Sequence, residues 1–304
     1  MAQDVLVIGG SNIDYAAFSQ KKLILGDSNI GKIKTSFGGV GRNLVENLAR
    51  LGHHVTFLTA IGNDPQGKQL KEDLESLSVR VLTPSYLKNT SSYLAIYDED
   101  SDMHVAVCDS EILDSMKVED LLPFEDIIDS FQSIILDMNL NQEVIDWIFS
   151  RYQEHHSILI EAVSANKVSR IQNHLSHLSF YKSNLLEARY LLHEEKSAAE
   201  LLSLLLEKGV KRAVISDSCN GIEYGDENGI HHFDVIPLKK IVSANGAGDA
   251  LFAGILHALL EEKTLKEAVA FGDKAAKKAL SSPEAVATDI ADILKDYRII
   301  PIKC

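Results

Sequence analysis

The chain is expected to be an α/β protein with a mostly parallel central sheet, helices on both faces of that sheet, and a small additional lid of β-strands. Short apolar segments that end at turn residues alternate with longer segments whose apolar residues recur every three or four positions. Such strand–helix alternation is typical of a parallel sheet covered on both faces. Two stretches of alternating polar and apolar residues in the first third of the chain break this rhythm, and they indicate strands outside the main sheet.

The elements of the main sheet and its helices follow from this pattern in chain order. The first strand is expected at residues 5–8, where the run Val-Leu-Val-Ile ends at a Gly-Gly turn. A helix is expected at residues 42–51, with four apolar side chains on one face and Gly52 directly after it. The further expected strands are residues 55–59, 134–136, 158–160, 213–215 and 240–242, and the further helices are residues 67–77, 144–152, 198–206 and 251–260.

The lid is expected from two separate segments, roughly residues 15–36 and 90–108. The first segment is rich in Lys, Gly and Ser with β-type residues between them, and the second alternates apolar and polar side chains. The 304 residues suffice for one large domain or two small ones, and we expect a single domain, residues 1–304, with the lid inserted in it. An exposed β lid can pair edge to edge with another subunit, so we expect a homodimer that forms through the lid.

Charge and composition argue against several classes of partner. The chain has 30 Lys and Arg residues against 44 Asp and Glu residues, a formal charge of −14, which does not favour binding to nucleic acid through broad electrostatics. No apolar run approaches the ~20 residues that span a bilayer, and the N-terminus lacks the basic region of a secretory signal. The three cysteines have no Cys-x-x-Cys spacing. Free thiols in a reducing cytoplasm are therefore expected.

The most informative motif is Asn245-Gly246-Ala247-Gly248-Asp249, at the start of an expected apolar helix. The first N–H groups of a helix have no acceptor within it and carry partial positive charge, and glycine lets an anion approach them closely. The motif predicts an anion site in which Asp249 accepts a proton from whatever attacks the anion. For this motif alone, a plain capping role of Asp249 is the more frequent explanation. Since a helix start lowers the pKa of a carboxylate, Asp249 is expected to be a weak base.

Two other glycine-rich segments lie where open α/β sheets bind ligands. In the first, Asn12 and Asp14 follow the carboxyl end of the first strand, where they either hold neighbouring hydroxyls of a sugar or stabilise a turn. A third glycine and a following helix are missing there, so the dinucleotide site of a nicotinamide dehydrogenase is not expected. In the second segment, Gly38 and Gly39 permit close approach to the backbone and Asn43 offers a donor and an acceptor, although glycine pairs also mark ordinary turns.

Two polar segments in the second half of the chain are candidates for contact with a polyphosphate. Asn184 and Glu187 lie three residues apart near a helix start, which fits either a capping arrangement or a site where Glu187 holds Mg²⁺ through water. Ser216 and Gly221 follow a strand, and they either meet nucleotide phosphates or form a plain hairpin turn.

Taken together and in this order, these segments resemble the ribokinase-like (PfkB) carbohydrate kinases over nearly the whole chain. The resemblance implies a three-layer α/β/α fold and ATP-dependent phosphorylation of an alcohol, with Asp249 as catalytic base and an anion hole at Gly246, Ala247 and Gly248. It implies that the substrate contacts Asn12, Asp14, Gly38, Gly39, Asn43 and Lys167. It implies that ATP contacts Asn184, Ser216, Asp217, Gly221, Asn245 and Asp273, with Mg²⁺ at Glu187.

Within that family, residues 31–52, 98–107, 136–140 and 162–167 most resemble the members that phosphorylate free pseudouridine at its 5′-hydroxyl. Kinases for another nucleoside or a sugar (ribose, fructose, adenosine or inosine) are the alternatives, followed by a non-catalytic nucleotide or sugar sensor of the same fold. Two positions depart from the family pattern. Ser243 replaces an Asp in a segment that binds an activating monovalent cation in many relatives, so weaker or differently built potassium activation is expected. Asp273 stands where the adenine side usually has Asn.

Overall fold

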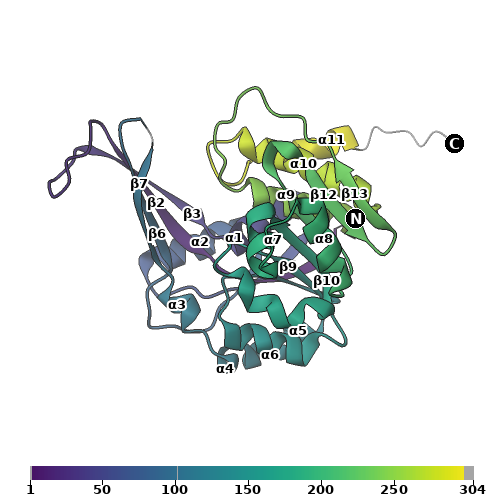
Figure 1. The fold of residues 1–304 in the computed structure, drawn as a ribbon. Coiled ribbons are helices and arrows are strands. Elements are labelled where there is room, and N and C mark those ends of the chain that lie inside the picture. The colour runs from purple at the N-terminus through teal and green to yellow at the C-terminus, as the bar shows by residue number, and fades with distance from the viewer. Residues whose placement is uncertain (1, 101, 298–304) are drawn as a thin grey trace.

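The computed structural model describes residues 2–100 and 102–297, and its centre is a nine-stranded sheet with the order β13-β12-β11-β10-β9-β8-β1-β4-β5 (Figure 1). The strands from β11 to β5 in this order pair in parallel, and β12 and β13 add an antiparallel hairpin at one edge. Their bounds are β1 (Asp4–Ile8), β4 (His54–Leu58), β5 (Arg80–Leu82), β8 (Ser133–Asp137), β9 (Ser157–Glu161), β10 (Leu178–Asn184), β11 (Ala213–Ser216), β12 (Ile222–Asp226) and β13 (Gly229–Phe233).

Helices cover both faces of this sheet, and the alternation of side chains along β1 explains why two separate cores form. Val5 and Val7 pack into one core with α1 (Val40–Arg50), α2 (Pro65–Ser76), α9 (Ala247–Leu260) and α10 (Leu265–Leu280). Leu6 and Ile8 pack into the other with α6 (Gln142–Tyr152), α7 (Leu185–Leu192) and α8 (Ala198–Glu207). The shorter helices are α3 (Glu111–Asp114), α4 (Val118–Leu121), α5 (Glu125–Asp129) and α11 (Ile293–Tyr297), and the 3₁₀ segments are η1 (Leu122–Phe124), η2 (Val168–His177), η3 (Ser218–Asn220) and η4 (Ile290–Asp292). The expected three-layer α/β/α class is confirmed.

A second sheet of four strands projects from the body of the molecule (Figure 1). Its order is β3 (Gly31–Gly38), β2 (Asn12–Ser19), β6 (Ser92–Tyr97) and β7 (Met103–Asp109), with a parallel pair β2–β6 between two antiparallel pairs. The strands expected outside the main sheet form this second sheet. Because β2 begins only four residues after β1 ends, Asn12 and Asp14 lie at the root of the second sheet.

Most expected elements of the main sheet are present within a few residues of the predicted bounds, but one expectation is wrong. Residues 240–242 form no strand, because Ile241 and Val242 stay half exposed and the N–H of Val242 donates to the carbonyl of Leu280 at the end of α10. The segment is a loop held by a helix end. Strand β10 was not expected, since its residues Tyr181 to Asn184 are mostly polar.

Two further expectations concern cysteines and membranes. Cys108 and Cys219 are free thiols, and Cys304 lies outside the described residues. Across residues 2–100 and 102–297, every helix is too short or too polar to cross a bilayer.

Candidate active site

The N-terminus of α9 has the backbone form that an anion site requires. Gly246 is the N-cap, with a left-handed φ of 75°. A Cβ on Gly246 would lie 2.7 Å from the carbonyl carbon of Ala285 and closer still to its oxygen, so the turn accepts only glycine. The N–H of Ala250 donates to the Gly246 carbonyl at 2.9 Å as the first bond within the helix. The N–H groups before it therefore face the open end of α9, where the helix dipole attracts negative charge.

Asp249 lies in the first turn of α9 but does not cap it. The helix has no side-chain cap, and the Asp249 side chain is buried. Its Oδ2 accepts a hydrogen bond of 2.8 Å from Nδ2 of Asn43, at the start of α1. The plain capping explanation therefore fails for Asp249, and the structure joins two motifs that are 206 residues apart in the chain.

The pKa of Asp249 differs from the expectation that a helix start would lower it. Burial raises the pKa of Asp249 to about 6, although the hydrogen bond from Asn43 and the charge of Lys182 act in the opposite direction. The charges of Asp137 and Glu187 add to the increase. Asp249 is thus a stronger base than a free aspartate, and the expectation of a weak base is wrong.

The residues expected on the substrate side come together at the root of the second sheet. Nδ2 of Asn12 donates to Oδ1 of Asp14, and both residues lie on strand β2 and not in a turn. A Cβ on Gly38 would lie 2.7 Å from the carboxyl carbon of Asp14, and one on Gly39 would lie 2.9 Å from Oδ1 of Asn12. Asn43 follows one turn later on α1. Burial raises the pKa of Asp14, against the Asn12 hydrogen bond and the charge of Arg42.

Asp137, which lies in the segment 136–140 but was not among the expected site residues, links these loops. One of its carboxylate oxygens accepts hydrogen bonds from the N–H groups of Gly10, at 2.9 Å, and Gly41, at 2.7 Å. Both oxygens also accept from Asn139, and Nζ of Lys167 donates to Oδ1 of Asn139 at 2.6 Å. Asp137 ends β8, which pairs with β1. The rule that polar residues gather at the carboxyl ends of neighbouring parallel strands would have found it.

A buried ion pair lies under the anion site. Nζ of Lys182 on β10 is 2.7 Å from Oε1 of Glu161 on β9, and both side chains are almost fully buried. The same ammonium lies 3.0 Å from the place where a Cβ on Gly248 would be. Burial disfavours the charge of Lys182, but Glu161 and nearby carboxylates outweigh it and raise the pKa of the ammonium. The structure therefore puts a positive charge against the N-terminus of α9, a place that by itself attracts anions.

The residues expected on the nucleotide side occupy the carboxyl ends of the next strands. Asn184 and Ser216 are register partners on β10 and β11. Asn184 caps α7 and forms a capping box with Glu187, in which each side chain accepts from the backbone N–H of the other, so the capping arrangement is present. Gly221, with a φ of 109°, turns the chain into the antiparallel strand β12, as in the hairpin interpretation.

Three other residues of this group have contacts of their own. Asp217 accepts a hydrogen bond of 3.0 Å from Asn220, which keeps it in the turn after β11. Asn245 is exposed, and its N–H donates to the hydroxyl of Ser243. Asp273 lies on α10 and forms an ion pair of 2.6 Å with Lys277, and no contact that the structure records joins it to Asn184 or Ser216.

The donor set suits Mg²⁺ better than a metal that needs several protein ligands. In the described part of the chain, no group of three or more His, Cys, Asp or Glu side chains can hold a metal ion. Mg²⁺ usually keeps several waters and takes one or two carboxylates together with substrate phosphates. Glu187 is a buried carboxylate close enough to Lys182 and Asp249 to influence the pKa of both. It fits such a water-mediated role.

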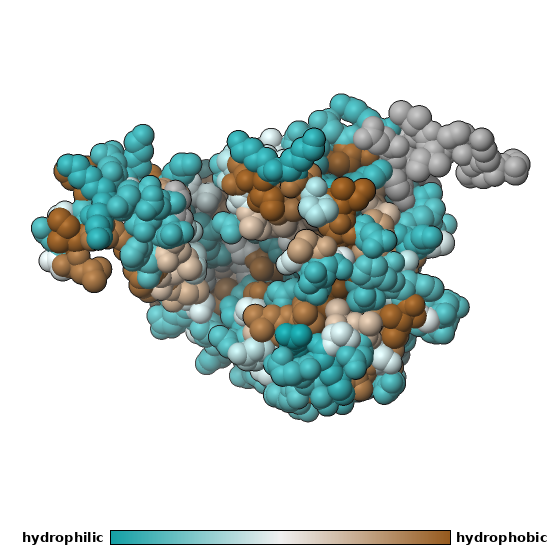
Figure 2. Space-filling model, turned by 45° about the horizontal axis from the view of Figure 1, so that its top comes forward, coloured by the Kyte–Doolittle hydropathy of each residue, from teal (hydrophilic) through white to brown (hydrophobic). Residues whose placement is uncertain are grey.

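The substrate-side residues come from the root of the second sheet and Asp249 comes from the body of the molecule. Figure 2 shows a hollow between these two parts. The floor of the site combines a carboxylate base, a helix N-terminus and a buried ammonium, contributed by α9 and β10. Such an arrangement can remove a proton from an alcohol while it stabilises negative charge on a neighbouring group.

Comparisons with known proteins agree with this chemistry. The model of the pfkB family carbohydrate kinases matches residues 2–291. Pseudouridine kinase of Escherichia coli (strain K12) is 32% identical over 285 residues, which cover 91% of this chain and 90% of that protein. Among solved structures, a carbohydrate kinase from Agrobacterium tumefaciens superposes with a TM-score of 0.87 at 24% identity, covering 97% of this chain and 96% of the other. Arabidopsis thaliana ribokinase complexed with ribose and ATP superposes with a TM-score of 0.82 at 18% identity, covering 97% of this chain and 98% of the other.

Proposed function

The chain belongs to the PfkB family of carbohydrate kinases, ATP-dependent phosphotransferases with an alcohol acceptor, and we propose that its acceptor is the 5′-hydroxyl of free pseudouridine. The products are pseudouridine 5′-phosphate, ADP and a proton. The observation that carries the proposal is the hydrogen bond between Asn43 and the buried Asp249. It brings the substrate-side loop to the base at the glycine-lined end of α9. The similarity to pseudouridine kinase supports the choice of nucleoside.

The substrate is proposed to lie across the roots of β2 and α1. Asn12 and Asp14 hold the ribose hydroxyls, and Gly38 and Gly39 leave room for these two side chains, because a Cβ there would collide with Asp14 or Asn12. Lys167, held by Asn139, contacts the substrate from the side of β8. Asn43 donates one N–H to Asp249 and has a second N–H for the substrate.

Asp249 accepts the proton of the 5′-hydroxyl as its oxygen attacks the γ-phosphorus of ATP. Phosphoryl transfer passes through a loose, charge-spread transition state, so positioning and electrostatics dominate the catalysis. The N–H groups of Gly246, Ala247 and Gly248 and the ammonium of Lys182 stabilise the negative charge of the migrating group. Lys182 is suited to this because Glu161 holds it against Gly248.

ATP is proposed to lie over the carboxyl ends of β10 and β11. Its contacts are with Asn184, Ser216, Asp217, Gly221, Asn245 and Asp273. Glu187 would hold Mg²⁺ through water, and the bound ion would neutralise phosphate charge. Since the hydroxyl of Ser243 is neutral and accepts a backbone N–H of its own loop, we propose that potassium activates this enzyme weakly. Turnover in potassium is expected to exceed turnover in a bulky organic cation only slightly, and strong potassium dependence would contradict the idea.

We also propose that residues 1–304 form one cytoplasmic kinase domain, in which the second sheet, roughly residues 15–36 and 90–108, is a lid that excludes water. The lid carries exposed apolar side chains on the face opposite Asp14, namely Ile33, Leu94, Val105 and Val107. Such a patch is typical of an interface, so a homodimer through the lid is proposed. Val105→Lys should yield a monomer in light-scattering measurements, whereas Leu122→Lys, at an exposed apolar residue outside the lid, should not. A wild-type monomer would disprove this assembly.

A screen of acceptors tests the function directly. ADP release is measured with pseudouridine, uridine, ribose, fructose and adenosine, each against an acceptor-free control, and the product is identified by mass. Pseudouridine should give the highest kcat/KM. Preference for ribose, fructose or an ordinary nucleoside would make the chain a kinase of the same family for that substrate. ATP binding without ADP formation from any acceptor would favour a sensor.

A single substitution tests whether Asp249 is the catalytic base. Asp249→Asn should keep the fold and ATP binding and lose about 10²–10⁴-fold in kcat, the usual contribution of general-base catalysis. Near-normal turnover in this variant would remove Asp249 from the mechanism.

A further inference from the structure

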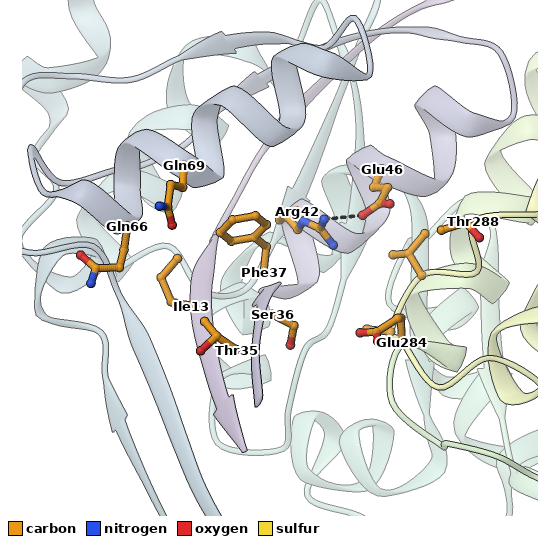
Figure 3. Close-up of a pocket in the computed structure, with 12 residues that line it drawn as sticks. Ile13, Thr35, Ser36, Phe37, Arg42, Glu46, Gln66, Gln69, Glu284 and Thr288 are labelled. Carbon is orange, nitrogen blue, oxygen red and sulfur yellow. Dashed lines mark ion pairs between the residues drawn. The ribbon is translucent and has the colours of Figure 1, made fainter. Parts of the chain in front are cut away.

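A pocket beside the root of the second sheet is lined by a buried arginine that none of the proposed steps uses. The pocket has a volume of about 490 Å³ and is bounded by β2, β3, α1, α2 and the loop at residues 284–288. Figure 3 shows Arg42 of α1 beside Phe37, with its guanidinium directed at Glu46. Asp249 does not line this pocket. Arg42 is only 7% exposed, so it forms part of the wall between the pocket and the interior.

The contacts of Arg42 reach in two directions. On one side its Nη2 forms ion pairs with Glu46, at 2.5 Å, and with Asp73 of α2, at 3.0 Å. On the other side its Nη1 donates to Oδ1 of Asn43 at 3.4 Å. Its Nε is buried and has no partner among the described residues. A buried donor without a partner costs about 1–3 kcal/mol, so the contacts of Arg42 do not fully satisfy its guanidinium.

The contact between Arg42 and Asn43 matters because the Asn43 side chain also forms a hydrogen bond with Asp249. The amide of Asn43 receives the Arg42 hydrogen bond on its oxygen and donates from its nitrogen to Oδ2 of Asp249. A carboxamide can rotate by half a turn and exchange these two atoms. A guanidinium on one side and a carboxylate on the other oppose that rotation. They also polarise the amide, so that its N–H becomes a stronger donor.

We propose that Arg42 is a positioning residue for the base: anchored by Glu46 and Asp73, it holds the Asn43 carboxamide with its N–H toward Asp249. The proposal deepens the kinase function proposed above and rests on it for its kinetic consequences. By this arrangement Arg42 sets the direction of the free Asp249 oxygen and acts on the acidity of Asp249 only through Asn43.

Other charges also act on these groups, and they must stay unchanged in a test. Asp249 is influenced by Lys182 on β10, Asp137 on β8 and Glu187 on α7. Arg42 itself faces Glu46, Asp73 and, more weakly, Asp14. Substitution of Arg42 leaves the first set intact, whereas substitution of any of those three would change the field at Asp249 directly.

Arg42→Gln and Arg50→Gln form a matched pair. Both arginines lie on α1 and pair with Glu46, but no contact joins Arg50 to Asn43, and its Nε is 2.7 Å from Oε1 of Glu46. Arg42→Gln should lower kcat about 10-fold or more, since small errors in position have large effects on rate, while the KM for ATP stays within about 2-fold. It should also move the acid limb of the pH–rate profile to higher pH. Arg50→Gln should do neither.

A measurement without turnover keeps the proposal testable even if the kinase proposal fails. The carboxyl carbons of ¹³C-labelled aspartates are titrated by NMR, and the signal of Asp249 is identified by its loss in Asp249→Asn. In Arg42→Gln the pKa of Asp249 should rise by about half a unit or more, because the hydrogen bond from Asn43 weakens, and in Arg50→Gln it should not change. An unchanged titration in folded Arg42→Gln, or the same shift in both variants, would overturn the proposal. If Arg42→Gln does not fold, Arg42→Lys, which keeps the charge without the planar fork, takes its place in the same comparison.

These two kinds of experiment separate failure of the kinase proposal from failure of the proposal about Arg42. Absence of ADP release from the wild-type protein with every acceptor would contradict the kinase proposal alone. The aspartate titration would still decide whether Arg42 acts on Asp249.

Discussion

Gly246 should be a residue that even alanine cannot replace, and the structure allows the effect to be estimated. An L-residue at its φ of 75° carries about 1–2 kcal/mol of backbone strain. The added Cβ would also lie 2.7 Å from the carbonyl carbon of Ala285, whereas real Cβ atoms essentially never approach within 3.0 Å, and nearer still to the oxygen. Both partners are backbone, so the turn or the loop at residue 285 must move. A displacement near 1 Å at a catalytic site lowers rates about 10²-fold.

The control for Gly246→Ala is Gly52→Ala. Gly52 has a φ of 93°, but a Cβ there would meet nothing within 4 Å. Both variants should therefore lose about 1–2 kcal/mol from backbone strain, measured as the free energy of unfolding in urea. Only Gly246→Ala should also lose about 10²-fold or more in kcat, by ADP release. Equal kcat values for the two variants, or normal turnover in Gly246→Ala, would refute the claim that this turn shapes the anion hole.

Three further predictions follow from buried titratable groups. Because the pKa of Asp249 is raised to about 6 and the base acts as a carboxylate, kcat/KM should fall as the pH drops through about 6, and a flat profile down to pH 5 would contradict this. Asp137→Asn replaces one carboxylate oxygen, which accepts hydrogen bonds from backbone N–H groups, with an NH₂ group that donates. The free energy of unfolding should therefore fall by about 1.5–3 kcal/mol, and the KM for the substrate that is phosphorylated should rise. Nε2 of His53 lies 2.9 Å from Nδ1 of His257, and burial lowers the pKa of both histidines, that of His257 to about 4. The unfolded chain therefore binds more protons than the folded chain between pH 6.5 and about 4, so stability should be lost as the pH falls through that window. The loss should be less steep in His257→Leu. Identical pH profiles of the melting temperature for the wild type and this variant would contradict the prediction.

The sheet and most helices could be predicted because their signal is local. Alternating apolar runs marked β1, β4, β8, β9 and β11 within a few residues. The apolar triplet at residues 240–242 misled because hydrophobicity alone does not supply a neighbouring strand, and the structure leaves Ile241 and Val242 half exposed. Strand β10 was missed for the opposite reason. Its Lys182 is buried and pairs with Glu161 on a neighbouring strand, and this partner lies 21 residues away in the chain.

The candidate site shows the same division between local and distant information. Asp249, Asn43 and Asn184 were expected in the site because each stands in a glycine-rich or capping motif. Asp137 entered only as part of the resembling segment 136–140, without a role, and Glu161 was missed, because each ends a strand without a glycine-rich or capping motif beside it. Their importance arises only when parallel pairing brings the ends of β8 and β9 next to β1 and β10.

The pKa of Asp249 illustrates why a motif can point to a candidate base without giving the strength of that base. A helix N-terminus stabilises a carboxylate by about 0.3–1 kcal/mol, which is less than one pKa unit at 1.36 kcal/mol per unit. Burial can shift a carboxyl pKa by several units in the other direction, and in Asp249 burial is the largest cause. The groups that moderate it come from α1 and β10, and those that reinforce it come from β8 and α7. A carboxylate with a pKa near 6 is still mostly ionised at pH 7 and accepts a proton more readily than a free aspartate. The tuning of Asp249 is therefore a property of the assembled sheet, and variants of Asn43 or Lys182 that leave the Gly-Ala-Gly-Asp motif untouched should still change it.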